Sequence, residues 1–268
     1  MNCQVDVIII GDSVEGHEAV KKIASENPAI KTAFISRNFR STTTHDYLNV
    51  EYLKEEVVLV DYKNRLFGCY LKNGDRIYST HLIIATGLLY EPLMLNNKVV
   101  PNVFHNTSDI PKTAKNQPAI VVGQHNSDVK FALTVAKKYK HVYLCTEKLT
   151  LENITPANVK KLAEAKNIIT LPNTSILKII APEGVLQTVE LDNYSTVTCA
   201  AIYVKTSATP EVNFIPTKLI QRDETNHLVV ADNAESLLVP KCFAIGNCAK
   251  KSTKRMSQLM VEAILKDF

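Results

Sequence analysis

Residues 5–16 constrain the fold of this chain more than any other stretch. They begin with a nearly unbroken run of β-branched residues that ends at Ile10. Such a run is typical of a strand buried on both faces of a parallel sheet. Gly11 follows, and residues 18–24 then have the apolar spacing of an amphipathic helix. The stretch therefore predicts a strand, a tight turn and a helix, the repeating unit of α/β proteins.

The predicted turn carries small residues at Gly11, Ser13 and Gly16. Three glycines at this spacing are typical of a dinucleotide-binding turn, where they permit a tight bend and close approach of the backbone to a diphosphate. Here Ser13 replaces the middle glycine. Asp12 and Glu15 also bring negative charge to the helix N-terminus, where a phosphate would lie. The residues fit either a dinucleotide site or a plain strand-to-helix turn.

Several further strands are predicted before residue 90. Residues 31–36 form the second strand of the predicted parallel sheet. Residues 56–61, 66–72 and 75–79 are predicted to form an antiparallel meander, because the Asn-Gly pair before the last segment favours a hairpin turn. Residues 81–87, HLIIATG, read as another buried strand that ends in a glycine turn.

The second half of the chain repeats this alternation. PAIVVG at 118–123 predicts a buried strand and a glycine turn, a helix is predicted over 128–138, and HVYLC at 141–145 predicts the next strand. Further predicted elements are a helix at 157–166, strands at 167–171, 175–181, 186–191, 198–204, 228–231 and 239–245, and a terminal helix at 257–268. In that last helix Leu259, Met260, Ala263 and Ile264 are predicted to face the core.

The order of these segments resembles the thioredoxin reductase-like branch of the pyridine nucleotide-disulfide oxidoreductases. The resemblance rests on the first glycine turn, LIIATG, the second VVG turn and FAIGN at 243–247, and it covers nearly the whole chain. It implies an α/β fold with two Rossmann-like three-layer dinucleotide-binding domains, the second inserted into the first, each with a small antiparallel β-meander. The implied boundaries are 1–110 and 209–268 for the FAD-binding domain and 111–208 for the NAD(P)-binding-like domain.

The resemblance implies an FAD site in the first domain. Ser36 stands where relatives carry an acid for the ribose hydroxyls, and Arg37 either meets a phosphate or faces solvent. Asn247 replaces an aspartate and keeps its hydrogen-bonding capacity without the charge. FAD binding is therefore expected to be weaker than in relatives. The implied FAD-site residues are Gly11, Ser13, Gly16, Ser36, Arg37, Ala85, Thr86, Gly87, Gly246 and Asn247.

The resemblance places a nicotinamide nucleotide at the second turn, with Gly123, Asn126 and Glu147 as candidate residues. Two of the three small residues of the family pattern are missing there, and Asp128 favours the helix dipole but opposes a phosphate. Glu147 either accepts from an NADH ribose and repels the 2′-phosphate of NADPH, or is a solvated loop residue. Binding of NADH or NADPH is thus doubtful from the sequence.

The cysteine pattern argues against disulfide chemistry. The six cysteines are scattered, no C-x-x-C occurs, and residues 39–47 and 106–129, where relatives place reactive thiols, contain none. Without such a thiol there is no relay from flavin to a substrate disulfide. With no export signal evident, the thiols are expected to be reduced and the protein cytoplasmic. The sequence suggests no metal ligands, and no residue could be assigned a catalytic role.

Charge and composition narrow the range of partners. A net charge of +4 is mild and does not indicate nucleic-acid binding. No stretch reaches the roughly 18 apolar residues that a membrane span needs. Lys250, Lys251, Lys254 and Arg255 either dock a small acidic electron-carrier protein or form a solvated basic face. The resemblance also implies a homodimer.

Three functions remain open from the sequence. The first is an FAD-dependent NAD(P)H oxidoreductase that passes electrons to an external acceptor, a carrier protein or a small molecule, without a protein dithiol. The second is a non-catalytic nucleotide-binding remnant that serves as a binding or scaffold protein. The third is a thioredoxin-disulfide reductase with an unrecognised thiol relay, which the missing C-x-x-C disfavours. Whether the chain is an enzyme is left open at this point.

Overall fold

The computed structural model divides the chain into two compact units. Unit 1 comprises residues 1–89 and 208–268, and unit 2 comprises residues 90–207. The first boundary predicted from the sequence, after residue 110, lies outside the described residues. The structure describes residues 2–39, 47–95, 98–100, 102–105, 116–151, 153–180, 187–193, 195–204 and 208–268.

Unit 1 is built on a five-stranded parallel sheet with the order β23-β8-β2-β3-β4. Its strands are β2 (Val7–Ile10), β3 (Thr32–Ile35), β4 (Val50–Leu53), β8 (His81–Ile84) and β23 (Cys242–Ala244). Every residue of β2, β3 and β8 is buried, as the β-branched run predicts for central strands. Ile10 lies level with Ile35 on one side and with Ile84 on the other, so these strands end at one edge.

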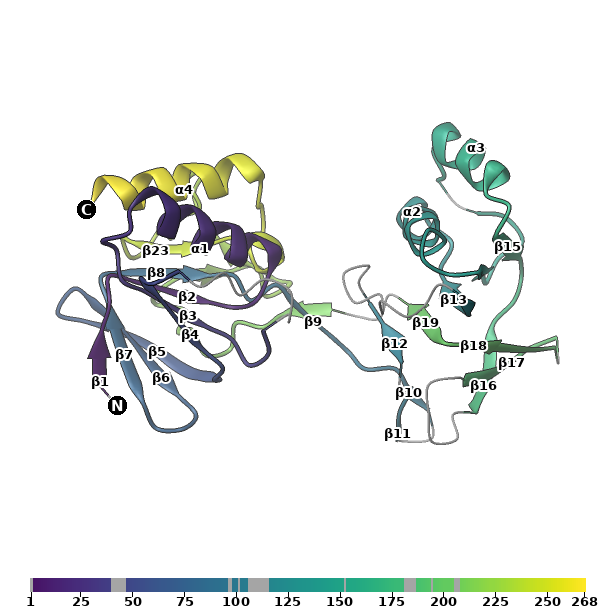
Figure 1. Cartoon of the computed structure of the whole chain (residues 1–268), viewed down its shortest axis with the longest axis horizontal. Coiled ribbons are helices and arrows are strands. Elements are labelled where there is room, and N and C mark those ends of the chain that lie inside the picture. The colour runs from purple at the N-terminus through teal and green to yellow at the C-terminus, as the bar shows by residue number, and fades with distance from the viewer. Residues whose placement is uncertain are drawn as a thin grey trace. The chain divides into compact units, whose positions relative to one another are not determined.

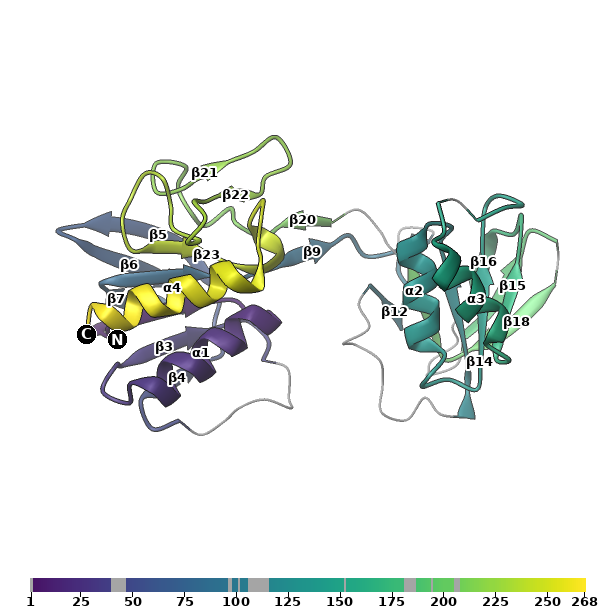
Figure 2. The same cartoon turned by 90° about the horizontal axis from the view of Figure 1, so that it is seen from above.

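Two layers cover this sheet (Figure 1). Helices α1 (Val14–Glu26) and α4 (Lys254–Lys266) lie on one face and run side by side in Figure 2. Val7 and Ile9 pack towards them, whereas Ile8 and Ile10 point to the opposite face. That face is covered by the sheet β1-β7-β6-β5, formed by β1 (Asn2–Gln4), β5 (Val57–Lys63), β6 (Leu66–Leu71) and β7 (Arg76–Ser79).

Short elements complete unit 1 near the ends of the parallel strands. The hairpin β21 (Gln221–Arg222) and β22 (Leu228–Val229) precedes β23. A 3-10 turn, η3 (Gly246–Cys248), follows β23. Strands β9 (Leu88–Tyr90) and β20 (Ala208–Pro210) pair with each other where the chain leaves and re-enters this unit.

Unit 2 repeats the same plan on a smaller scale. Its five-stranded parallel sheet has the order β12-β19-β13-β14-β15. A three-stranded antiparallel meander, β16-β17-β18, packs on one face, and helices α2 and α3 lie on the other. The bounds are β10 (Met94–Leu95), β11 (Lys98–Val99), β12 (Val103–Phe104), β13 (Pro118–Val122), α2 (Asn126–Val135), β14 (His141–Cys145), α3 (Pro156–Glu164), β15 (Ile168–Leu171), β16 (Ile176–Ile180), β17 (Gln187–Leu191), β18 (Thr196–Cys199) and β19 (Ala201–Val204).

The predicted fold class is confirmed, with one local error in the terminal helix. Both units have three layers and a small meander, and unit 2 is inserted into unit 1. Helix α4 begins at Lys254, three residues earlier than predicted, because the Thr253 side chain caps it by accepting from the backbone N–H of Met256 at 3.2 Å. Leu259, predicted to face the core, is 36% exposed. Among the described helices, none has the length and apolarity needed to cross a membrane.

Candidate functional site

The structure brings three of the predicted glycine segments together at one edge of the unit 1 sheet. Gly11 directly follows β2, Ala85 directly follows β8, and Gly246 lies two residues after β23. Because β2, β8 and β23 are parallel and in register, their carboxyl ends meet at the same edge. This edge is where open α/β sheets bind ligands.

At two positions of the first turn, Gly11 and Gly16, the structure leaves no room for any residue other than glycine. Gly11 has φ 109°, and a Cβ there would lie 2.4 Å from the Ala85 carbonyl oxygen and the Thr86 Cα. Gly16 is buried on the first turn of α1, and a Cβ there would lie 2.7 Å from the Gly11 carbonyl oxygen. The strand, the helix and the segment after β8 thus approach one another as closely as backbones can.

Ser13, at the position of the missing middle glycine, caps helix α1. Its hydroxyl accepts a hydrogen bond from the Gly16 backbone N–H at 3.1 Å. The neighbouring Asp12 carboxylate pairs with the His17 imidazole, and both side chains are largely buried. The cap is therefore a neutral hydroxyl, and the charge of Asp12 already has a partner.

Glu15 carries the second negative charge of this turn towards Gly246. A Cβ on Gly246 would lie 2.9 Å from Glu15 Oε2, so the carboxylate reaches the 3-10 turn after β23. The Gly246 N–H donates to the Ser252 hydroxyl at 2.7 Å. Beside them the Thr86 hydroxyl is buried and makes no hydrogen bond within the described part of the chain. A buried, unused hydroxyl at this edge is suited to a ligand.

Ser36 and Arg37, predicted to contact FAD, have other partners. The Ser36 hydroxyl donates to the Asn38 carbonyl oxygen at 3.3 Å. The Arg37 guanidinium is exposed and pairs with the carboxylate of Glu211, with that of Glu56 3.9 Å away. Both carboxylates already engage the Arg37 guanidinium, and its contact with a phosphate stays a prediction.

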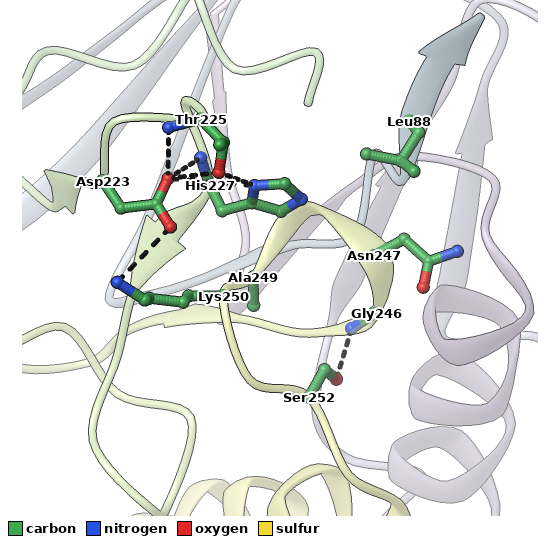
Figure 3. A pocket seen from close by; sticks show the side chains of 9 residues that line it. All are labelled: Leu88, Asp223, Thr225, His227, Gly246, Asn247, Ala249, Lys250 and Ser252. Atoms are coloured by element: carbon green, nitrogen blue, oxygen red, sulfur yellow. Dashed lines mark hydrogen bonds and ion pairs between the residues drawn. The ribbon is translucent and has the colours of Figure 1, made fainter. Parts of the chain in front are cut away.

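A polar cavity of about 480 Å³ lies beside η3, in unit 1 (Figure 3). It is lined by Leu88, Asp223, Thr225, His227, Gly246, Asn247, Ala249, Lys250 and Ser252. The Thr225 hydroxyl bridges two of these residues, because it lies 2.8 Å from Asp223 Oδ1 and 2.8 Å from His227 Nδ1. Lys250 Nζ lies 3.6 Å from Asp223 Oδ2.

This bridge determines the tautomer of His227. Burial alone would raise the pKa of Asp223, but hydrogen bonds from Thr225 and from the His227 backbone, with the charge of Lys250, lower it to about 2. The ionised carboxylate can only accept, so the Thr225 hydroxyl donates to it and must accept from His227 Nδ1. In the neutral ring Nε2 is then an acceptor without a hydrogen-bond partner among the described residues, and Figure 3 shows that nitrogen turned towards Asn247.

Asp223, Thr225 and His227 were not predicted from the sequence as site residues. The turn DETNH contains an aspartate followed at two and four residues by a threonine and a histidine. Such spacing is typical of an Asx turn, and Asp223 Oδ1 indeed accepts from the backbone N–H groups of Thr225 and His227. The signal for the turn was present, whereas the closeness of Lys250 and Asn247 depends on the tertiary fold.

The second glycine turn, in unit 2, is filled by the side chain of Asp128. Gly123 has φ 155°, and a Cβ there would lie 2.5 Å from the carboxyl carbon of Asp128. Asp128 Oδ2 accepts from the backbone N–H groups of Gln124 at 3.1 Å and His125 at 3.0 Å. Asp128 is 6% exposed.

The other two candidates for the nicotinamide site do not point to a ligand. Asn126 Oδ1 accepts from Asn158 Nδ2 at 2.7 Å and from the Thr155 backbone N–H at 3.1 Å, so this side chain joins α2 to α3. Glu147 is exposed on the loop after β14. Asn126 thus has a structural role, and the role of Glu147 stays a prediction.

None of the six cysteines takes part in a disulfide. Five are buried, and only Cys3 is partly exposed. Burial raises the pKa of Cys145 to about 11 and those of Cys199 and Cys242 to about 12, and it also raises the pKa values of Cys69 and Cys248. Since the thiolate is the reactive form, these thiols are poor candidates for a redox relay. Among the described residues no group of side chains could hold a metal ion.

A family model for pyridine nucleotide-disulphide oxidoreductases matches residues 8–246. The chain belongs to this family. Among curated proteins no sequence match was found. The matching segment includes both glycine turns and reaches the glycine of FAIGN, which are the segments on which the resemblance was based.

Solved thioredoxin reductases share the fold of this family member. The enzyme from T. acidophilum has a TM-score of 0.71 at 15% identity, with 98% of each chain covered. The enzyme from Lactococcus lactis, in a form called the FR conformation, has a TM-score of 0.67 at 16% identity, again with 98% of each chain covered. That from Giardia duodenalis has a TM-score of 0.61 at 20% identity, with 98% of this chain and 99% of that chain covered.

Family membership implies sites for FAD and NAD(P), and the two turns differ in how well they suit these groups. The first turn keeps the glycines, the close approach and an unused buried hydroxyl, so its backbone fits a diphosphate. Its misfit lies in two carboxylates, that of Asp12, which pairs with His17, and that of Glu15, which reaches the edge beside Gly246. The second turn does not fit, because the Asp128 carboxylate already accepts from its N–H groups.

Proposed function

We propose that this family member binds FAD in unit 1 and is an oxidoreductase that passes electrons to an external acceptor without a protein dithiol. The observation that carries the proposal is the first turn, where Gly11 and Gly16 keep the backbone contacts that a diphosphate site needs. FAD would supply the redox chemistry, and the protein would bind and orient it.

The residues that would hold FAD follow from the edge at which the three segments meet. The N–H groups at the start of α1 and the Ser13 hydroxyl would meet the diphosphate, and Asn247 would meet the sugar alcohol chain. The Thr86 hydroxyl is buried and available there. The Glu15 carboxylate opposes the diphosphate, so FAD affinity should be lower than the backbone alone would give.

The state of the thiols supports an acceptor outside the chain. Five buried cysteines with raised pKa values cannot exchange readily with a substrate disulfide. Reduction of thioredoxin by NADPH should therefore not exceed the background of free flavin. The cavity beside Asn247, with the free Nε2 of His227, favours a small-molecule acceptor over an acidic carrier protein, because Lys250 is already paired with Asp223.

A second candidate function is a non-catalytic scaffold that has kept the fold and lost the cofactor. The position of Glu15 favours it, because its carboxylate, which would lie 2.9 Å from a Cβ added at Gly246, occupies part of the edge where FAD would pass.

Uptake of FAD distinguishes the two functions. The purified chain is titrated with FAD, and binding is followed by quenching of flavin fluorescence. We expect a dissociation constant in the micromolar range, and tighter binding in the double variant Asp12→Ala, Ser13→Gly. If neither the wild type nor this variant takes up FAD at micromolar concentration, the flavoenzyme proposal fails and the scaffold takes its place.

A further inference from the structure

The carboxylate of Asp128 occupies the positions that an anion would take at the second turn. Oδ2 accepts from two successive backbone N–H groups, those of Gln124 and His125. Oδ1 accepts from the Ser127 hydroxyl at 3.2 Å. A bound phosphate at a glycine turn uses such N–H groups and the adjoining helix N-terminus.

The fit of this carboxylate against the turn is tight. Its carboxyl carbon would lie 2.5 Å from a Cβ on Gly123, so the side chain packs directly on the Gly123 backbone. Asp128 is also 94% buried, since only 6% of it is exposed. A diphosphate cannot approach the two N–H groups unless the side chain first leaves them.

We propose that Asp128 acts as a tethered anion that excludes the diphosphate of NADH and NADPH from unit 2. Competition for the N–H groups and electrostatic repulsion both lower the affinity of the turn for a diphosphate. The carboxylate holds the donors at an effective concentration that a free ligand does not reach, and its negative charge repels the phosphates at the same helix N-terminus. The structural role of Asn126 agrees with this, because the hydrogen bond from Asn158 engages a second polar side chain at the start of α2.

Exclusion of NADH and NADPH from unit 2 limits which molecules can reduce FAD. This inference rests on the function proposed for unit 1. If FAD binds in unit 1, a nicotinamide nucleotide held at the second turn is not its reductant. The two-unit family fold would then work with one nucleotide site in place of two.

The test compares three variants with the wild type by calorimetric titration with NADH and with NADPH. Asp128→Ala vacates the N–H groups, and Asp128→Asn keeps the shape of the side chain without its charge. Asp192→Ala is the control, because Asp192 Oδ2 accepts from the Ser175 backbone N–H elsewhere in unit 2. We expect a dissociation constant above about 1 mM for the wild type and the control, at least tenfold tighter binding for Asp128→Ala, and an intermediate value for Asp128→Asn.

Two outcomes would overturn the proposal. One is wild-type binding of either nucleotide below about 50 μM. The other is a variant that remains folded and gains no affinity. Loss of the contacts of Asp128, the third residue of α2, could unfold this helix, so circular dichroism accompanies each titration, and Asp128→Ser provides a second neutral variant if Asp128→Ala unfolds. FAD uptake is measured on the same samples, since its failure would contradict the function proposed for unit 1 and leave the result on Asp128 unaffected.

Discussion

The two glycine turns of this chain follow the same backbone plan and differ in the side chain that accepts hydrogen bonds from nearby backbone N–H groups. Each follows a buried parallel strand, contains a glycine with positive φ and leads into a helix. In the first turn a neutral hydroxyl, from Ser13, accepts one helix N–H. In the second a carboxylate, from Asp128, accepts two N–H groups of the turn.

This difference shows that the number of glycines is a poor measure of what such a turn can bind. The first turn has lost its middle glycine and keeps an edge that a diphosphate can approach, because the replacement is a small neutral cap. The second has an internal anion where the ligand's anion would lie. The identity of the capping group, and its charge above all, decides which turn remains a candidate nucleotide site.

The largest expected effect comes from adding a methyl group at each turn. Gly11→Ala should lower the free energy of unfolding by about 4 kcal/mol, because its Cβ meets backbone atoms that cannot move away and its φ is strained. Gly123→Ala should cost less, about 2–3 kcal/mol, because its Cβ meets Asp128, whose carboxyl group can rotate away although its Cβ, at 2.6 Å, cannot. Urea unfolding followed by circular dichroism measures both. Equal costs would show that the two turns are equally tight.

The backbone of both turns could be predicted from the sequence, and their caps could not. The β-branched runs before Gly11 and Gly123 indicate buried parallel strands, and the carboxyl ends of such strands meet at one edge for any sequence that forms the sheet. The alignment of Gly11, Ala85 and Gly246 therefore follows from topology. Whether the Asp128 carboxylate points into the second turn depends on its side-chain conformation, which no residue pattern specifies.

Other details depend on contacts between distant segments. Glu15 reaches Gly246, and Asp223 reaches Lys250, only because β22, β23 and α1 are assembled around one edge. In α4 the buried stripe is Met256, Met260, Val261 and Ile264. Leu259 is apolar, but it lies about 100° from Met260 around the helix and so faces away from this stripe. The apolar pattern alone could not place the helix on the sheet.

Removing the charge of Glu15 should make the first turn a better nucleotide site and so increase its difference from the second turn. Glu15→Gln should tighten FAD binding about fivefold to tenfold, because one unit of charge near a diphosphate is worth about 1 kcal/mol or more at an effective dielectric near 20. Glu18→Gln, an exposed change one turn further along α1, is the matched control and should have little effect. Flavin fluorescence quenching gives both affinities. Equal affinities for Glu15→Gln and the wild type would show that this carboxylate does not face the FAD site.

Acidification should lower the free energy of unfolding of unit 1 before that of unit 2. Burial lowers the pKa of His81 in unit 1 below 6.5, although its hydrogen bond to Asp267 opposes the shift. A group with a lowered pKa in the folded state stabilises the fold above its unfolded pKa, so this contribution is lost as the pH falls below about 6.5. Hydrogen bonds from Lys241 and His81 lower the pKa of Asp267, so its contribution is lost below 3.8.

Unit 1 should therefore lose stability before unit 2 on acidification, by about 1 kcal/mol between pH 7 and pH 5. Among the described residues of unit 2 the groups with shifted pKa values are Tyr139, Cys145 and Cys199, which titrate on the alkaline side. Hydrogen exchange of the two units at both pH values measures the difference. His81→Gln should flatten the dependence of unit 1. A parallel loss in both units would contradict the assignment to His81.

The smallest effect concerns the thiols, in which the two units should not differ. Burial raises the pKa values of the cysteines in both units, and Cys3, at the start of unit 1, is the one that solvent reaches in part. A thiol-specific reagent at pH 8 should therefore modify at most one cysteine per native chain, and six after denaturation. Cys3→Ser should abolish the native reaction and leave FAD uptake unchanged, because Cys3 lies outside the edge formed by Gly11, Ala85 and Gly246. Rapid modification of two or more thiols in the native chain would reveal an accessible pair, and would reopen the disulfide reductase interpretation that the buried cysteines now oppose.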